Sequence, residues 1–286
     1  MRGRGARSSL WARDLRLGRK FAILSAMNYS TLTHRTEDRV AVVTLNRPER
    51  RNSLDDVMIR EVTEVFALIN RSTTTRSVIL TGNGASFCAG MDLDYLQRFS
   101  AKGEPENLED AKNLSRMLQA VHTLKKPVIA AVNGPALGGG CGLAAACDFV
   151  FAAKETAKIG APEVRLGFLP AVILIYLVKR MGASRAREFV LMGAVLTPDD
   201  AKDKGLVTEV VSQDLLMGKA MEFAQSLATT TSPSSISLTK ELFARMDEMS
   251  TKDAMEYAAS LNALTRKTDD FKKGVESFLK KEKLSW

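Results

Sequence analysis

Three short segments of the sequence combine residue types that can do chemistry. Residues 159–167 (Ile-Gly-Ala-Pro-Glu-Val-Arg-Leu-Gly) place one carboxylate, that of Glu163, beside a proline in an apolar setting bounded by glycines. Burial there would raise the pKa of the carboxyl group and make it a usable general acid or base. The alternative is structural, because Glu163 has the option of a salt bridge with Arg165 or with another surface cation.

Glycines dominate the other two segments. Residues 81–93 (Thr-Gly-Asn-Gly-Ala-Ser-Phe-Cys-Ala-Gly-Met-Asp-Leu) follow a strand-like run, and their glycines permit a ligand to approach backbone N–H groups, although an ordinary turn would use them too. Residues 133–148 carry three consecutive glycines, 138–140, followed by Gly142, where a helix is predicted to begin. Free N–H groups and the positive end of the helix dipole favour an anion at such a place. We therefore expect an oxyanion site made of backbone amides.

The elements that must position these segments alternate between strands and helices. Apolar residues at three- and four-residue spacing predict one helix from Leu54 to Ile69 and another from Leu108 to Val121, with a loop at 100–106 before the second. Repeated strand–helix–strand units indicate an α/β fold with mainly parallel pairing. The predicted strands are 40–45, 78–81, 127–132 and 148–152. Beyond residue 213 only helical patterns remain, at 214–229, 233–248, 251–265 and 268–281.

Composition and charge exclude several classes of protein. The chain has 286 residues, of which 45% are hydrophobic and 26% charged, and this excludes disordered, collagen-like and disulfide-dense chains. The net charge is +8, but residues 1–26 hold seven basic residues and one acid, which leaves only +2 for the rest. With aromatic residues at 6%, we expect no nucleic-acid partner. The longest apolar run, 168–178, is too short to span a bilayer, so we expect no membrane association.

Metal and disulfide chemistry have little support in the sequence. The three cysteines, Cys88, Cys141 and Cys147, have neither CxxC nor zinc-ligand spacing, and His34 and His122 are the only histidines. We expect no metal site. The cysteines are predicted to be small buried apolar residues of a protein in a reducing compartment.

Residues 1–26 require a separate interpretation. They are rich in arginine and serine and nearly free of acids, which is typical of a mitochondrial transit peptide. The alternatives are a mis-assigned start, with Met27 as the true initiator, and a functional basic arm. We expect a cytoplasmic protein, or a mitochondrial matrix protein if the segment is a transit peptide.

Taken together, the three segments resemble the crotonase (enoyl-CoA hydratase/isomerase) superfamily, and the resemblance covers most of residues 39–286. Residues 46–54 (Asn-Arg-Pro-Glu-Arg-Arg-Asn-Ser-Leu) resemble the first acyl-CoA-binding stretch of that family. Residues 87–93 resemble its first oxyanion loop, and residues 134–141 resemble its second. The tail, 278–286, is similar to the closing segment of the family, with Leu284 where proline is common.

This resemblance implies a fold, an assembly and a reaction. The fold would be a ββα spiral core at 27–212 with a helical trimerisation module at 213–286, assembled as a homotrimer or as a dimer of trimers. The substrate would be an acyl-CoA thioester, with no separate cofactor. The N–H groups of Met91 and Gly139 would stabilise an enolate on the thioester oxygen, and Glu163 would be the general acid/base. The residues implied in CoA binding are Arg51, Ser53, Leu54, Ala89, Met91, Asp92, Leu93 and Gly138.

Two departures from the family pattern bear on the reaction. Family hydratases generally carry two glutamates, and Gly142 stands where the first would be. Two carboxylates can position and activate a water molecule, whereas one can shuttle a proton, so the sequence favours Δ3,Δ2-double-bond isomerisation. Hydration stays open if Asp92, Asp94 or a bound anion replaces the missing group. Residues 170–173 (Pro-Ala-Val-Ile) replace glycines that are common in relatives and are expected to narrow the acyl pocket.

Two further classes of function remain open. A decarboxylase or C–C lyase on the same scaffold would use the same oxyanion site with different acid/base residues. A non-catalytic acyl-CoA-binding homologue is favoured by Gly142 and disfavoured by the retained Glu163.

Overall fold

The computed structural model describes residues 29–286, so the predictions for residues 1–26 lie outside the described part of the chain. The strands are β1 Leu32–Glu37, β2 Val40–Leu45, β3 Ser77–Gly82, β4 Val128–Val132, β5 Pro135–Leu137, β6 Phe149–Ala153, β7 Lys158–Gly160, β8 Val195–Leu196 and β9 Glu209–Val211. The α-helices are α1 Asp56–Arg71, α2 Leu93–Ser100, α3 Glu104–His122, α4 Gly139–Ala146, α5 Ala171–Met181, α6 Ala183–Leu191, α7 Pro198–Asp203, α8 Leu216–Thr230, α9 Pro233–Met246, α10 Thr251–Thr265 and α11 Asp269–Lys280. Short 3-10 helices lie at η2 Pro48–Arg50, η3 Glu163–Leu166 and η4 Gln213–Leu215.

Two sheets form the α/β body. The larger has the strand order β1-β2-β3-β4-β6-β9, in which β1 and β2 are antiparallel and every other neighbouring pair is parallel. The smaller sheet has the order β5-β7-β8. The four strands predicted from apolar runs are β2, β3, β4 and β6, each correct to within one residue at either end. The predicted α/β class with mainly parallel pairing is confirmed.

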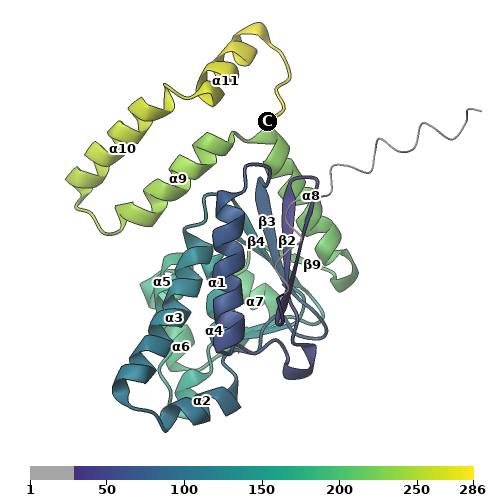
Figure 1. Ribbon diagram of the computed structural model, residues 1–286, viewed down its shortest axis with the longest axis vertical. Helices are drawn as coiled ribbons and strands as arrows, with labels where there is room; N and C mark the ends of the chain where they lie inside the picture. The colour runs from purple at the N-terminus through teal and green to yellow at the C-terminus, as the bar shows by residue number, and fades with distance from the viewer. Residues whose placement is uncertain (1–28) are drawn as a thin grey trace, which may run out of the picture.

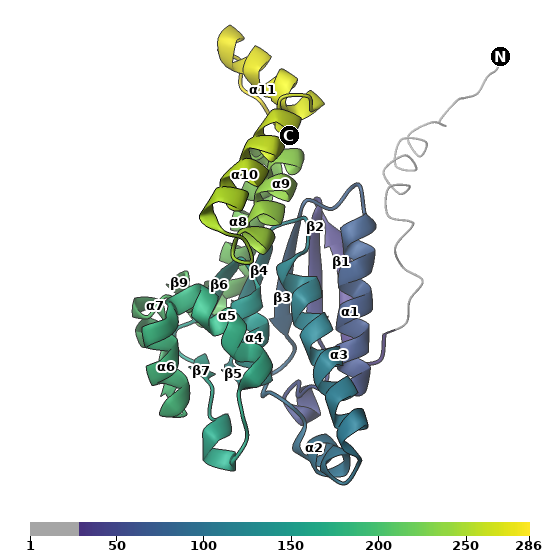
Figure 2. The same ribbon diagram turned by 90° about the vertical axis from the view of Figure 1, so that its left-hand side faces the viewer.

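Helices cover the larger sheet and explain the character of its strands. Helix α8 packs along β2, β3, β4 and β6, while α1 and α3 pack against each other beside the sheet (Figures 1 and 2). All six residues of β3 are buried. A strand that is covered on both faces has no polar side to show, so it is a continuous apolar run rather than an alternating one. The predicted helix from Leu54 is α1, which begins after Asp55 and buries its apolar face.

The sequence-based expectation left out strands β5, β7, β8 and β9 and helices α2, α5, α6 and α7, and it differs from the structure in two further places. The predicted loop at 100–106 is wrong at both ends, because Ser100 closes α2 and α3 begins at Glu104. Pro105 lies in the first turn of α3, where a backbone N–H has no intrahelical partner to lose. Strand β1 was not predicted. Its residues alternate between buried or half-buried and exposed at the edge of the sheet, and several are polar, so it lacks the apolar run that marks the central strands.

The four predicted C-terminal helices are confirmed as α8, α9, α10 and α11. Helices α9 to α11 project from the body as an arm (Figure 1), and none of their residues is buried. Ion pairs from Lys240 to Asp148 and from Lys179 to Asp247 connect α9 and its end to the body. Within residues 29–286, no helix is long and apolar enough to cross a membrane.

Candidate functional site

The glycine-rich segments meet where the parallel strands end. The side chain of Asn133, just after β4, accepts a hydrogen bond from Gly82 N (3.1 Å) and donates one to Gly84 O (2.9 Å). The amide of Asn52 donates to Ser86 O (2.8 Å) in the same way. Two side-chain amides therefore hold together the loops that follow three neighbouring strands.

Residues 51–54 pair with residues 89–92 in a short parallel ladder. Ala89 N donates to Arg51 O (3.0 Å), Leu54 N to Gly90 O (2.7 Å) and Asp92 N to Leu54 O (2.9 Å). The two sequence segments predicted to bind CoA thus form one rigid unit. The backbone of Met91, which bridges to Leu54, is fixed by hydrogen bonds on both sides of it.

The same loop is also fixed to β5, which leads into α4. Cys88 N donates to Pro135 O (3.1 Å), and Leu137 N donates to Cys88 O (3.0 Å). A side chain at Gly140 would come within 2.1 Å of Cys88 O, so only glycine permits this close approach. The loop at 87–93 therefore lies directly against the start of α4. All three cysteines are free and buried, as predicted, and burial raises the pKa of the Cys88 thiol to about 12.

Two unused backbone N–H groups lie side by side at this place. A methyl group placed on Gly139 would lie 3.8 Å from Met91 N. Neither the Met91 N–H nor the Gly139 N–H donates a hydrogen bond within the part of the chain that the structure describes. Gly139 is the first residue of α4, where the helix dipole presents its positive end. The pair has the donor arrangement of an oxyanion site.

Glu163 begins η3 and lies against the glycine run. A methyl group on Gly138 would be 3.1 Å from Glu163 Oε1. Glu163 Oε2 is buried and has no hydrogen-bond partner among residues 29–286, and no ion pair involves this carboxylate there. Arg165 instead donates to Met192 O (3.3 Å), so the salt-bridge alternative for Glu163 is wrong. Burial raises the pKa of the Glu163 carboxyl group, and a hydrogen bond from its own backbone N–H offsets only part of that effect.

An isoleucine fills the space that a second carboxylate would need. A Cβ atom on Gly142 would lie 2.2 Å from Ile173 Cγ2 and 2.7 Å from Ile173 Cβ. Ile173 belongs to α5, which packs against α4, and its side chain is 3% exposed. Gly142 and Ile173 are therefore fitted to each other. The sequence placed both residues in the site region but gave no sign of this contact.

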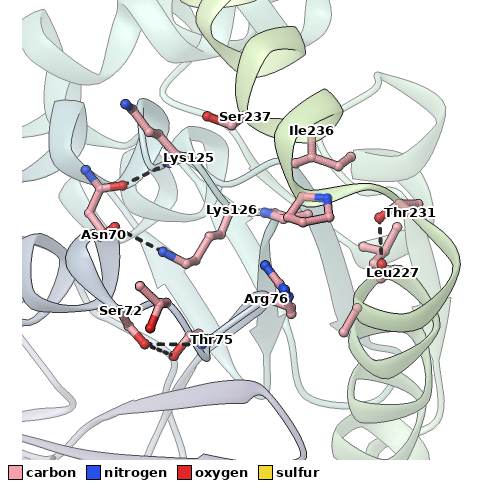
Figure 3. Close-up of a pocket in the computed structure, with 14 residues that line it drawn as sticks. Asn70, Ser72, Thr75, Arg76, Lys125, Lys126, Leu227, Thr231, Ile236 and Ser237 are labelled. Atoms are coloured by element: carbon pink, nitrogen blue, oxygen red, sulfur yellow. Dashed lines mark hydrogen bonds between the residues drawn. The ribbon is translucent and has the colours of Figure 1, made fainter. Parts of the chain in front are cut away.

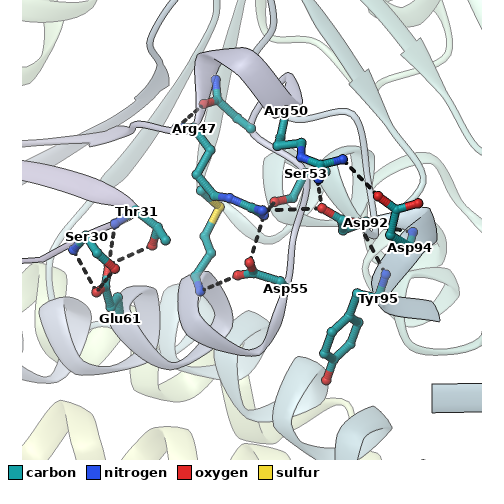
Figure 4. A network of polar contacts seen from close by, with 12 residues as sticks. Ser30, Thr31, Arg47, Arg50, Ser53, Asp55, Glu61, Asp92, Asp94 and Tyr95 are labelled. Atoms are coloured by element: carbon teal, nitrogen blue, oxygen red, sulfur yellow. Dashed lines mark hydrogen bonds and ion pairs between the residues drawn. The ribbon is translucent and has the colours of Figure 1, made fainter. Parts of the chain in front are cut away.

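Asp92 belongs to a polar network that supports the oxyanion loop (Figure 4). Arg47 pairs with Asp55 (3.0 Å) and with Asp92 (3.3 Å), and Ser53 Oγ donates to Asp92 Oδ2 (3.2 Å). Asp92 also caps α2 by accepting from Tyr95 N (3.2 Å). Burial alone would raise the pKa of Asp92, but the hydrogen bonds from Tyr95 N and Ser53, with the nearby arginine charges, lower it. A carboxylate held ionised in this way is a poor replacement for a second catalytic acid.

The other predicted site residues gather at the same edge with different exposure. Arg51 and Leu93 are exposed, Ala89 and Met91 are half-buried, and Leu54 is buried. Asp94 is exposed and pairs with Arg50 (2.9 Å), so it too is engaged by an arginine. Arg47 is the residue that sequence reasoning missed. It lies within the stretch 46–54, but its partners Asp55 and Asp92 are brought together only by the fold.

No cluster of three or more His, Cys, Asp and Glu side chains suited to a metal ion occurs in the described chain, residues 29–286.

A family model and several known proteins match this chain over nearly its whole described length. A family model described as enoyl-CoA hydratase/isomerase matches residues 35–286. A Thermus thermophilus relative with a provisional enoyl-CoA hydratase name is 40% identical over 85% of this chain and 95% of its own length. The Escherichia coli 2,3-dehydroadipyl-CoA hydratase is 34% identical over 86% of this chain and 94% of its own. The crystal structure of an enoyl-CoA hydratase from Bacillus anthracis superposes with a TM-score of 0.81 at 31% identity, covering 89% of this chain and 98% of that one.

Proposed function

The chain belongs to the enoyl-CoA hydratase/isomerase family, and from that premise we propose that it converts an acyl-CoA thioester through an enolate, as a Δ3,Δ2-enoyl-CoA isomerase. The thioester oxygen accepts hydrogen bonds from Met91 N–H and Gly139 N–H. These two N–H groups donate no hydrogen bond within residues 29–286 and lie side by side. Each is worth about 3 kcal/mol to the developing enolate, by analogy with oxyanion holes in general.

Glu163 moves the proton in this proposal. Its ionised carboxylate takes a proton from C2 of a 3-enoyl thioester, and the electron pair of that C–H bond spreads over the dienolate and its oxygen. The protonated carboxyl then returns the proton at C4, which leaves the double bond between C2 and C3. A half-buried carboxylate with one buried oxygen free of partners and a raised pKa suits both steps, because no cation among residues 29–286 holds it in the ionised form and burial favours the protonated form.

The contact between Gly142 and Ile173 is the observation that most supports isomerisation over hydration. Water addition in the family pattern uses two carboxylates, and here the side chain of Ile173 occupies the position of the first. Asp92 and Asp94, the two residues considered as replacements, are engaged by Arg47, Ser53 and Arg50 instead. One carboxylate and two N–H donors remain, which is enough to move a proton between two carbons.

Hydration is the second candidate, because the similar proteins carry hydratase names. The deciding experiment compares crotonyl-CoA hydration with 3-enoyl-CoA isomerisation in one preparation, for the wild type and for Glu163→Gln. We expect isomerisation to dominate and to fall by about 10²- to 10⁴-fold in the variant, because the amide cannot take the proton.

Glu188→Gln, an exposed glutamate on α6, is the matched control and is expected to retain activity. Exclusive hydration by the wild type would overturn the isomerase assignment, and full turnover by Glu163→Gln would overturn the role of Glu163.

The two other classes of function have their own tests. Carbon dioxide release from a malonyl-type CoA would identify the decarboxylase alternative. Tight CoA binding without any turnover would identify a non-catalytic homologue.

We also propose that the chain assembles through its C-terminal arm, as a homotrimer or a dimer of trimers. The arm has no buried residue in a single chain, yet large apolar side chains lie exposed along it. They are Phe243, Met246, Met255, Leu264, Phe271, Val275, Phe278 and Leu279. An exposed apolar surface of this kind marks a protein–protein contact.

The proposal of acyl-CoA chemistry also includes a set of residues that bind CoA. They are Arg51, Ser53, Leu54, Ala89, Asp92, Leu93 and Gly138.

A further inference from the structure

A cavity lies at the opposite end of the sheet from Glu163, where α8 turns into α9. Its volume is ≈ 180 Å³. Residues just before β3 and β4 form one wall, and the joint between the two helices forms the other (Figure 3). The polar side chains that could contact a ligand there include Arg76, Lys125, Lys126, Thr231 and Ser237.

Three cations line this cavity without an ion pair among residues 29–286. Arg76 Nε is buried and has no hydrogen-bond partner in that range. Lys126 Nζ donates to two backbone carbonyls at the end of α1, those of Ile69 (2.7 Å) and Asn70 (3.1 Å). Burial, with the charges of Arg76 and Lys125, lowers the pKa of Lys126, so the three positive groups affect one another.

Asp270 is the carboxylate whose pKa responds to the charge of Arg76, and it already accepts hydrogen bonds from other residues. Asp270 accepts hydrogen bonds from Ser232 Oγ (2.7 Å) and from Ser234 N (3.0 Å), which hold the first turn of α9. Burial would raise the pKa of Asp270, but these hydrogen bonds and the charge of Arg76 lower it. One carboxylate balances at most one of the three cations, so the cavity keeps an excess of positive charge.

We propose that this cavity binds a small tetrahedral oxyanion, of the size and charge of inorganic phosphate. The guanidinium of Arg76 presents the planar donor set that suits such oxygens, and Lys125 adds a point charge at the entrance. A volume of ≈ 180 Å³ has room for one such oxyanion. Ser237 adds a hydroxyl group from α9, whereas the Thr231 hydroxyl already donates to Leu227 O (2.6 Å) at the end of α8.

Such an anion would connect the α/β body to the C-terminal arm. Arg76 and Lys125 belong to the body, whereas Thr231 and Ser237 belong to the joint and to the arm. Binding would therefore slow the opening of that joint. This gives the experiment a readout besides affinity, namely amide hydrogen exchange at 227–237.

The experiment titrates the full chain with inorganic phosphate by calorimetry, at constant ionic strength set with chloride. We expect saturable binding of one anion per chain and slower exchange at 227–237. Arg76→Gln should weaken binding at least about tenfold, the value of one charge-assisted hydrogen bond. Lys125→Gln should also weaken it, while Arg71→Gln, an exposed arginine at the end of α1 outside the cavity, should change affinity less than twofold.

A second titration with free CoA, which carries phosphate groups of its own, separates this cavity from the catalytic site. Displacement of phosphate by CoA, absence of saturable binding by the wild type, or unchanged binding by both Arg76→Gln and Lys125→Gln would each overturn the proposal. Lys125 is exposed, so its variant keeps the test valid if Arg76→Gln fails to fold. None of these outcomes depends on which reaction the catalytic site performs.

Discussion

Glu163 carries the only carboxylate oxygen among residues 29–286 that is both buried and without a hydrogen-bond partner. Its neighbours are the glycine run at 138–140 and the thiol of Cys141, whose pKa is raised first by burial and then by the Glu163 charge. An ionised carboxylate in such a place costs stability, because desolvation disfavours the charged form and no cation compensates. This loss of folding stability applies to the protein without substrate, and it disappears when the Glu163 carboxyl group is protonated.

A stability prediction concerns the same residue. The pKa of Glu163 is raised in the folded state, so its favourable contribution is complete below the ordinary glutamate pKa of about 4.3 and is lost as the pH rises through the folded value. The variant Glu163→Gln loses no folding stability in this way, because the glutamine side chain does not ionise. The variant should therefore be more stable than the wild type at pH 8, with the difference shrinking as the pH falls toward 4. Urea denaturation at several pH values measures this. A difference that does not change with pH would contradict it, and Glu188→Gln should show none.

At the scale of elements, α4 and α5 pack against each other, and Gly142 and Ile173 form the tightest contact that concerns the site. Any side chain at 142 would collide with Ile173, whose own Cβ is only 2.7 Å from where the new Cβ would lie. Removing the outer carbons of Ile173 is therefore insufficient, and glycine is needed at 173 before a larger residue fits at 142. This contact between Gly142 and Ile173 leaves no room for a carboxylate side chain at position 142.

The corresponding prediction uses three variants. Gly142→Glu alone should lose about 1–3 kcal/mol of folding free energy through overpacking, with little gain in hydration. Gly142→Glu combined with Ile173→Gly should recover part of that stability and raise the ratio of hydration to isomerisation at least about tenfold. Ile173→Gly alone controls for the lost packing. Both reactions are measured on the purified variants. A single Gly142→Glu variant that is fully stable and hydrates efficiently would show that the contact does not limit the chemistry.

At the scale of the whole molecule, the arm of α9, α10 and α11 has too little of its own packing to be stable by itself. Its connections to the body include two ion pairs, the cavity at the α8–α9 joint and the C-terminal residue Trp286. The N–H of Trp286 donates to Thr229 O (3.0 Å), and its backbone O accepts from Arg39 Nη1 (2.5 Å). The apolar side chains on the arm are available for another copy of the chain. Assembly would bury them and hold the arm in place.

The prediction for the arm concerns the mass of the particle in solution. Phe278 is 82% exposed on α11, and Phe278→Glu should convert the oligomer into single chains because a charge cannot be buried in an apolar contact. Lys272→Glu, also on α11, changes the charge without removing an apolar group and should leave the mass unchanged. Light scattering coupled to gel filtration measures both. An unchanged mass for Phe278→Glu would rule out this contact, as would a wild type that is already a single chain.

Local patterns predicted much of this molecule, and contacts between distant segments account for the rest. The covered strands and the four C-terminal helices follow from runs and periodicities within about 15 residues, and a helix start was correctly expected at the glycine run. The short α2 and the edge strand β1 have weak local patterns and were missed. The pairing of Gly142 with Ile173, and of Arg47 with Asp92, joins segments more than 30 residues apart, which no local pattern records.

The fit between Gly142 and Ile173 also constrains how this chain could change over evolutionary time. A mutation that introduces glutamate at 142 first meets a blocked space and is removed by selection for stability. A mutation at 173 must come earlier, and by itself it brings only a cavity and no new activity. The order of substitutions toward a two-carboxylate site is therefore fixed, and its first step is disadvantageous. As long as Ile173 is retained, the proposed one-carboxylate chemistry is therefore kept as well.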